Sequence, residues 1–288
     1  MSTPARLLFP VFLMILTLLA VPASAQEETE PAPASEEGGQ DRESMALDST
    51  ATQWSFQGAY QMMPSYYEDT LDNGTVRPAG NDDYAQLRIV APVPLKSFTL
   101  LPRLTLRHYE NPQGQSGMGN TELFALVVPQ KWDWGSGRTG IGPLVTLPGD
   151  PDVAKDEWGY GLAAAVVNSA GRWFYGLLLT QSWRSVDPNV VAEGESDTNP
   201  LGIAPFLNFR LDKGWYLGNG DMVARYNWDN SEFYLPIGIR LCKVLVQPKA
   251  SWNFYVEYQT SLVKSNWSGA AVKESWRFNV TYTMPVGL

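Results

Sequence analysis

The sequence predicts an all-β protein: a closed, antiparallel, up-and-down transmembrane β-barrel of about twelve strands. The first observation is the alternation in residues 276–288, because an extended chain sends successive side chains to opposite faces. The second is the absence, beyond residue 25, of any apolar run near the ~18 residues that a spanning helix needs. The alternating apolar residues of this last stretch are Phe278, Val280, Tyr282, Met284, Val286 and Leu288.

The same alternation recurs along the chain from residue 51 to the last residue. Most of the segments have about the nine to eleven residues needed for a tilted crossing of a bilayer. The pattern is mixed in 121–128, which is apolar on both faces apart from Glu122, and also in 139–147 and 215–228. The expected strands are 53–62, 84–92, 98–107, 121–128, 139–147, 158–166, 173–183, 201–211, 215–228, 232–241, 252–262 and 276–288.

The connections between these strands alternate in length, which is the third observation. The first, third, fifth and seventh are long and polar, whereas the second, sixth and eighth are short; the ninth, at Asp229 and Asn230, is short and departs from the pattern. Outer-membrane barrels have long loops on the outside and short turns in the periplasm. We therefore expect both ends of the folded part to be periplasmic.

Alternation alone does not tell the inside of a barrel from the outside, so a soluble β-sandwich or lipocalin-like barrel is the alternative. Two features favour the membrane form. The less hydrophobic faces carry small residues that suit a crowded lumen better than a solvated surface: Gly140, Gly142, Gly159, Gly161, Ala163, Gly202 and Ala204. Tryptophans recur near strand ends, where interfacial belts lie: Trp54, Trp158, Trp173, Trp183, Trp215, Trp228, Trp252 and Trp276.

Two segments precede the barrel of residues 51–288. Residues 1–25 read as a signal peptide, with Arg6, an apolar run and an Ala-Ser-Ala pattern that favours cleavage after Ala25 over a membrane anchor. Residues 26–50 hold eight acids against one base, with several Pro and Gly residues. Such a segment buries too little apolar surface to offset its ordering entropy, and we expect a disordered acidic tether in the periplasm.

Composition excludes several classes of function. The formal net charge of −9 resides mostly in residues 26–50, so the folded part is nearly neutral and offers no nucleic-acid surface. A single cysteine, Cys242, excludes an internal disulfide, and with the single histidine it is too little for a zinc site. The acids at 150–157 lack the glycine-bracketed pattern of a calcium loop. We expect no metal and no cofactor.

Several short motifs, in order between residues 117 and 285, resemble a known family. They are Gly117-Met-Gly-Asn-Thr-Glu-Leu123, Trp134-Gly with Gly140-Ile-Gly-Pro-Leu-Val-Thr-Leu-Pro148, Trp158-Gly-Tyr-Gly-Leu162, Pro205-Phe-Leu-Asn-Phe-Arg210 with Gly214-Trp-Tyr-Leu217, and Leu235-Pro-Ile-Gly-Ile-Arg240. This order is similar to the bacterial outer-membrane family named for the MetA pathway of phenol degradation, also described as neuromedin-U-like. The resemblance implies an outer-membrane β-barrel that passes small, often hydrophobic, molecules, and it implies no catalytic residue.

The alternation also predicts which charged residues line the lumen. A charge facing lipid at the midplane costs roughly 2–4 kcal/mol, so these side chains should point inward. They could form a structural ladder of ion pairs, or a basic constriction that selects anionic or polar solutes. The predicted lumen residues are Arg88, Arg103, Arg107, Glu122, Arg210, Glu232, Arg240, Glu257 and Arg277.

Three functions are open at this point. The first is a channel or binding barrel in the bacterial outer membrane for small solutes, including hydrophobic or aromatic ones. The second is a lipid-acting hydrolase with His108 as base, for which Ser116 is the nearby hydroxyl. The third is a plugged structural or surface-interaction barrel. The expected partners are outer-membrane lipid, a small-molecule solute, and the barrel-assembly machinery through residues 276–288.

Overall fold

The computed structural model describes residues 42–48, 50–71, 74, 76–77, 83–111, 113–130, 137–154, 157–185, 199–229 and 231–286. The predicted signal peptide, residues 26–41 of the predicted tether, and Leu288 lie outside these described residues. Among the described residues no helix is both long enough and apolar enough to span a membrane.

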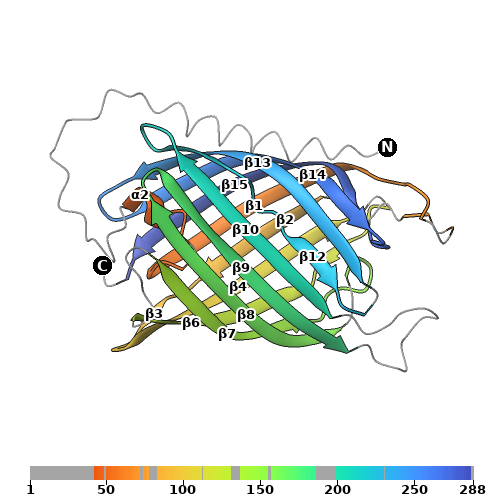
Figure 1. Cartoon of the computed structure of the whole chain (residues 1–288), viewed down its shortest axis with the longest axis horizontal. Coiled ribbons are helices and arrows are strands. Elements are labelled where there is room, and N and C mark those ends of the chain that lie inside the picture. The colour runs from red at the N-terminus through yellow and green to blue at the C-terminus, as the bar shows by residue number, and fades with distance from the viewer. Residues whose placement is uncertain are drawn as a thin grey trace. The chain divides into compact units, whose positions relative to one another are not determined.

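The described strands form one closed antiparallel sheet, which is a β-barrel whose strands run at a steep tilt in Figure 1. Twelve strands make up its wall, and the predicted fold class is confirmed. Nine of its wall strands are β1 (Gln53–Tyr66), β2 (Tyr84–Val90), β4 (Phe98–Glu110), β6 (Thr121–Pro129), β7 (Arg138–Leu147), β8 (Trp158–Ala170), β9 (Trp173–Ser185), β10 (Pro200–Arg210) and β13 (Glu232–Val246). The others are β14 (Ser251–Ser265), β15 (Val272–Pro285) and one interrupted strand, β11 (Trp215–Gly218) followed by β12 (Ala224–Asn227).

The barrel closes where the last strand meets the first. β15 pairs antiparallel with β1, from Gln53 opposite Pro285 to Met62 opposite Trp276. Every backbone group along this seam can then be paired, which an apolar surrounding demands. Two short strands extend the connections: β3 (Val93–Pro94) pairs with β4 after the second wall strand, and β5 (Ser116–Met118) pairs with the outer end of β4.

The apolar face points outward and the polar face points into the barrel. On β13, Ile237 and Ile239 are 45% and 54% exposed on the outer surface. On the neighbouring strands Glu257 and Arg277 are only 1% and 2% exposed, and both belong to the interior network. This arrangement is opposite to that of a soluble barrel with an apolar core. It confirms the orientation on which the membrane reading depends.

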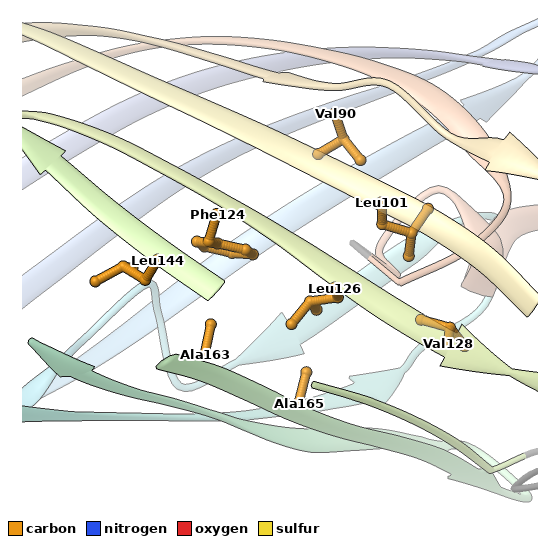
Figure 2. Close-up of a cluster of buried hydrophobic side chains, with 8 residues drawn as sticks. All are labelled: Val90, Leu101, Phe124, Leu126, Val128, Leu144, Ala163 and Ala165. Carbon is orange, nitrogen blue, oxygen red and sulfur yellow. The ribbon is translucent and has the colours of Figure 1, made fainter. Parts of the chain in front are cut away.

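One part of the interior is nevertheless apolar. β6 carries apolar residues on both faces, and its inward set packs with side chains from the neighbouring strands into a buried cluster that lines one side of the lumen (Figure 2). Gly142 lets the backbones of β6 and β7 approach closely, because a Cβ built on it would lie 1.7 Å from the Ala125 carbonyl oxygen. We call this set the apolar wall; its members are Val90, Leu101, Phe124, Leu126, Val128, Leu144, Ala163 and Ala165.

The expectation of one continuous strand at 215–228 is wrong. β11 ends at Gly218 and β12 begins at Ala224, and residues 219–223 leave the wall toward the lumen. Gly220 adopts a φ of +85°, which disfavours a side chain there, and a Cβ on it would come within 2.6 Å of Glu257 Oε1. We call residues 219–223 the inward break.

The expectation of a disordered tether is wrong for its last residues. Helix α2 (Arg42–Met45) and the residues after it are folded against the end of the barrel where β1 begins (Figure 1). Ser44, Met45 and Asp48 are buried, and Asp48 is only 3% exposed. The acids of this segment find partners on the barrel wall, which composition alone does not reveal. We call residues 42–48 the plug segment.

The outward orientation makes a stability prediction at the middle of β13. Replacing Ile239 by Arg should destabilise the barrel in a bilayer by roughly 2–4 kcal/mol, because a guanidinium at lipid depth loses its hydration. Urea titration of folding into phospholipid vesicles measures this free energy. Val76→Arg is the matched control, since Val76 is 61% exposed in the loop that follows β1. Equal stability of the two variants would contradict an outer face in contact with lipid.

Candidate functional site: a lumen with two kinds of wall

One cavity of about 640 Å³ runs through the barrel interior. At one end it is lined by Ala46, Leu47 and Asp48 of the plug segment, and at the other by residues 267–269 of the loop before β15. A volume of this size is typical of sites for small molecules, about 300–1,000 Å³. Val90 and Leu144 of the apolar wall line one part of the cavity. Another part, the charged side, is lined by Arg88, Arg103, Arg107, Glu122 and Arg240.

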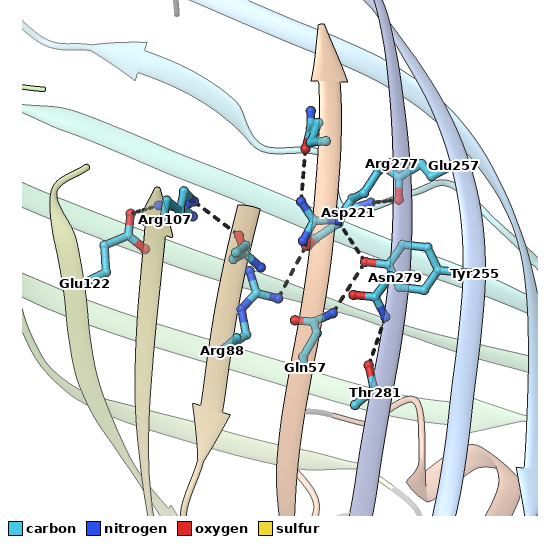
Figure 3. A network of polar contacts seen from close by, with 12 residues as sticks. Gln57, Arg88, Arg107, Glu122, Asp221, Tyr255, Glu257, Arg277, Asn279 and Thr281 are labelled. Carbon is cyan, nitrogen blue, oxygen red and sulfur yellow. Dashed lines mark hydrogen bonds and ion pairs between the residues drawn. The ribbon is translucent and has the colours of Figure 1, made fainter. Parts of the chain in front are cut away.

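Asp221 of the inward break is the centre of the charged side (Figure 3). Its Oδ2 lies 3.4 Å from Arg88 Nη1 on β2 and 3.5 Å from Arg277 Nη2 on β15. Its backbone N–H donates to Glu257 Oε2 at 2.8 Å. The inward break thus extends across the lumen to strands on the far side, where one carboxylate compensates two guanidinium groups.

Arg277 is held from several sides. Its Nε donates to the Tyr255 hydroxyl at 3.1 Å, and its Nη1 donates to Gln61 Oε1 at 3.0 Å and to the Tyr84 hydroxyl at 3.1 Å. A buried guanidinium with this many acceptors has its position fixed to a small range. Arg277 is therefore a rigid part of the constriction.

Two other arginines have partners of their own. Arg107 pairs with Glu122 at 3.5 Å, and its Nε donates to Gln86 Oε1 at 3.2 Å. Arg240 donates to Asn208 Oδ1 at 2.9 Å, and its guanidinium lies over the Tyr255 ring, 5.1 Å from the centroid. These contacts tie β2, β4 and β6 together on one side, and β10, β13 and β14 on the other.

The end of the cavity opposite the plug segment is held by contacts between two loops. Arg77, 3% exposed, donates from Nε to Asp69 Oδ1 at 2.8 Å and from Nη1 to the Trp267 carbonyl oxygen. The hydrogen bond from Arg77 holds the pKa of the Asp69 carboxyl below its usual range. The loop after β1 is thereby tied to the loop before β15.

The structure brings most of the predicted lumen residues together, but not all. One group surrounds the cavity at the level of the inward break: Arg88, Arg103, Arg107, Glu122, Arg240, Glu257 and Arg277. Arg210 lies at the plug end, where its Nη2 donates to Ser44 Oγ at 2.6 Å. Glu232 lies at the opposite end and accepts from the Ser268 backbone N–H at 3.2 Å.

Besides Asp48 of the plug segment, three charged lumen residues on the barrel were not predicted from the sequence. Arg184 and Arg225 line the cavity, and Asp221 is the centre of its network. The sequence Gly218-Asn219-Gly220-Asp221 contains the signal for the third, because two glycines and two polar residues interrupt an otherwise alternating strand. Arg184 lies on the inward face of β9, one position after the end of the strand 173–183 that the alternation predicted.

The hydrolase hypothesis finds no support in the arrangement of its residues. His108 is exposed at the outer end of β4, opposite Met118, whereas Ser116 is paired with Glu110. Among the described residues no hydrogen bond to the His108 side chain is seen, and no group of three or more His, Cys, Asp or Glu is placed to hold a metal ion. A nucleophile–base pair needs contact at hydrogen-bond distance.

Comparison with known proteins gives a likeness at the level of the fold. No family model matches the chain, and no curated protein matches it. An outer-membrane channel of Pseudomonas putida F1 is similar over 81% of this chain and 95% of its own, with 17% identity and a TM-score of 0.59. The porin NanC is similar over 81% of this chain and 100% of its own, with 8% identity and a TM-score of 0.50. The chain therefore has the fold of an outer-membrane β-barrel.

Proposed function

We propose that this protein is an outer-membrane channel, or binding barrel, for small solutes, including hydrophobic or aromatic ones. The observation that carries the proposal is a cavity of about 640 Å³ that extends from the plug segment to the loops at the opposite end of the barrel. Its two kinds of lining suit molecules that are not purely polar. The exposed apolar outer face, with Ile237 and Ile239, supports a place in the lipid of the outer membrane.

The topology in the envelope is part of the same proposal. The plug segment, the start of β1 and the end of β15 lie at the same end of the barrel as the turn after β13. In bacterial barrels the short turns face the periplasm, so we place both ends there, with a signal peptide cleaved after Ala25. The ordered motifs support membership of the family named for the MetA pathway of phenol degradation. Residues 276–288 supply the terminal strand to the barrel-assembly machinery.

Recordings in planar bilayers and solute uptake by proteoliposomes test the transport proposal. We expect a small conductance, because the plug segment and the inward break narrow the lumen, together with uptake of small solutes. Protein that is folded by heat-shifted mobility on gels, yet gives neither conductance nor uptake, would favour the plugged structural barrel instead.

His108→Ala separates transport from lipid hydrolysis. His108 is exposed at the outer end of β4 and lines no part of the cavity, so conductance and uptake should be unchanged. Phospholipid hydrolysis by the wild-type protein in mixed micelles, abolished by this substitution, would replace the channel by the hydrolase. The readout is release of fatty acid at matched protein concentration.

A further inference from the structure

Arg103 lies where the apolar wall meets the charged side of the lumen. Its Cζ is 4.6 Å from the centroid of the Phe124 ring on the adjacent strand β6. It also lines a small hollow whose other members are almost all apolar: Thr50, Val90, Leu101, Phe124, Leu126, Ala165, Val167, Leu178 and Phe206. A cation at the edge of an apolar surface is costly to desolvate and needs a compensating anion.

No carboxylate among the described residues forms an ion pair with Arg103, and Asp221 and Glu122 act on it only from a greater distance. In the described part of the chain no carboxylate lies within 4.0 Å of its guanidinium, and its buried Nε has no hydrogen-bond acceptor. The two nearest arginines on the charged side do have partners: Arg88 pairs with Asp221, and Arg107 pairs with Glu122. Arg103 differs from them in being adjacent to the apolar wall rather than to an acid.

The surplus of positive charge extends along the cavity. Arg184 and Arg225, which also line it, have no carboxylate within 4.0 Å in the part of the chain that the structure describes. The electrostatic neighbours of Arg184 include Arg225 as well as Glu122 and Glu157. An anion that enters the lumen therefore meets uncompensated guanidinium groups on its way to Arg103.

We propose that the lumen binds an amphipathic carboxylate, with its carboxylate on Arg103 and its apolar body against Val90, Leu178 and Phe206, which line the same cavity. This inference rests on the proposed channel function and names its solute class. The planar guanidinium fork matches a carboxylate in two hydrogen bonds, and the adjacent aromatic rings favour a flat apolar body. A purely polar anion leaves the apolar wall unused, and a neutral arene leaves the Arg103 charge uncompensated.

Benzoate, acetate and benzyl alcohol are the probes. Acetate has the carboxylate of benzoate without the ring, and benzyl alcohol has the ring without the carboxylate. Their dissociation constants come from concentration-dependent block of the chloride current in bilayers, and from calorimetry on the detergent-solubilised protein. We expect the wild-type protein to bind benzoate at least about tenfold more tightly than acetate or benzyl alcohol. A charge-assisted bidentate contact and a buried ring each change a dissociation constant by about that factor. Equal affinities for all three would overturn the proposal.

Substitutions locate the site. Arg103→Gln should weaken benzoate binding about tenfold and leave benzyl alcohol unchanged, whereas Arg103→Lys should retain part of the benzoate preference because the charge remains. Phe206→Leu should reduce the advantage of benzoate over acetate, because Phe206 lines the cavity together with Arg103. Arg172→Gln is the control, since Arg172 is 58% exposed at the turn before β9 and pairs with Asp212 outside the lumen.

The two proposals fail in different ways. A protein without current or uptake that still binds benzoate in the calorimeter refutes the channel and keeps the binding site. A conducting protein with no benzoate preference keeps the channel and refutes the amphipathic carboxylate. If Arg103→Gln does not show the heat-shifted gel mobility of a folded barrel, Arg103→Lys and Phe206→Leu carry the test. An unchanged benzoate affinity in either folded variant of Arg103 would refute the placement.

Discussion

Asp48→Asn should open the lumen at its plug end. In single-channel recordings we expect large-conductance openings to be more frequent in this variant than in the wild-type protein. Asp48 Oδ2 pairs with Arg138 Nη1 on β7 at 3.2 Å, and Oδ1 accepts from the Thr50 backbone N–H at 2.7 Å. The side chains of Asp48 and Arg138 are 1% and 11% exposed. Loss of one partner from a buried ion pair costs about 3–5 kcal/mol, because the remaining buried charge loses that counter-charge.

That energy acts on the docking of the plug segment, because the barrel strands on either side of Arg138 keep their own ladder bonds. At about 1.4 kcal/mol for each factor of ten, the undocked population should rise by about a hundredfold to a few thousandfold. Contacts of Arg210 with Ser44 and of Tyr216 with Glu43 remain, so docking is weakened rather than abolished. Deleting residues 42–47 should give a steadily open channel.

Asp212→Asn is the matched control for this prediction. Arg172 and Asp212 form an ion pair with the same 3.2 Å separation, but their side chains are 58% and 82% exposed. Exposed pairs contribute about 0–1 kcal/mol, and the gating of this variant should match the wild type. Single-channel recordings at fixed voltage make the comparison. If Asp48→Asn and the deletion both conduct like the wild type, the plug segment does not limit the pore.

The sequence predicted those features of the fold that follow from the alternation of apolar and polar residues along a strand. Whether a side chain faces lumen or lipid is a local property of a strand, so Glu257, Arg277 and Ile239 could be assigned to a face without a structure. The inward apolar residues Phe124 and Leu126 could not, because their strand is apolar on both faces and alternation carries no information there.

The parts that depend on distant pairing could not be predicted. Arg88 and Asp221 are 133 positions apart in the chain, and they meet only because the barrel closes and the inward break crosses the lumen. The glycines around Asp221 mark an interruption, but the direction in which the chain leaves the strand depends on Glu257 and the opposite wall. The plug segment is similar: its composition is that of a disordered chain, and the order comes from Arg138 and Tyr216 far along the sequence.

Asp221→Asn should convert the lumen into a strongly anion-selective pore. Asparagine keeps the shape of the side chain and the inward break, whereas it removes the carboxylate that lies 3.4 Å from Arg88 and 3.5 Å from Arg277. At an effective dielectric constant near 20, a unit charge 4 Å away contributes about 4 kcal/mol. If the loss of this charge changes the energy difference between chloride and potassium in the lumen by only a third of that amount, the chloride-to-potassium permeability ratio rises about tenfold.

The zero-current potential in a KCl gradient measures this ratio. Asp229→Asn is the control: it removes the same charge from an exposed carboxylate outside the lumen, where Asp229 accepts hydrogen bonds from Asn199. Its selectivity should equal that of the wild type, because surface charges beyond a Debye length of about 8 Å are screened.

The second arginine of the cluster gives the compensating variant. Arg88→Gln combined with Asp221→Asn removes one charge of each sign, and its permeability ratio should return toward the wild-type value. The single variant should also lose its heat-shifted gel mobility at a lower temperature, since it leaves buried guanidinium groups without their shared counter-charge. A double variant as anion-selective as the single one would mean that permeating ions do not sense the charge at Arg88. An unchanged ratio in Asp221→Asn itself would mean that they bypass the inward break.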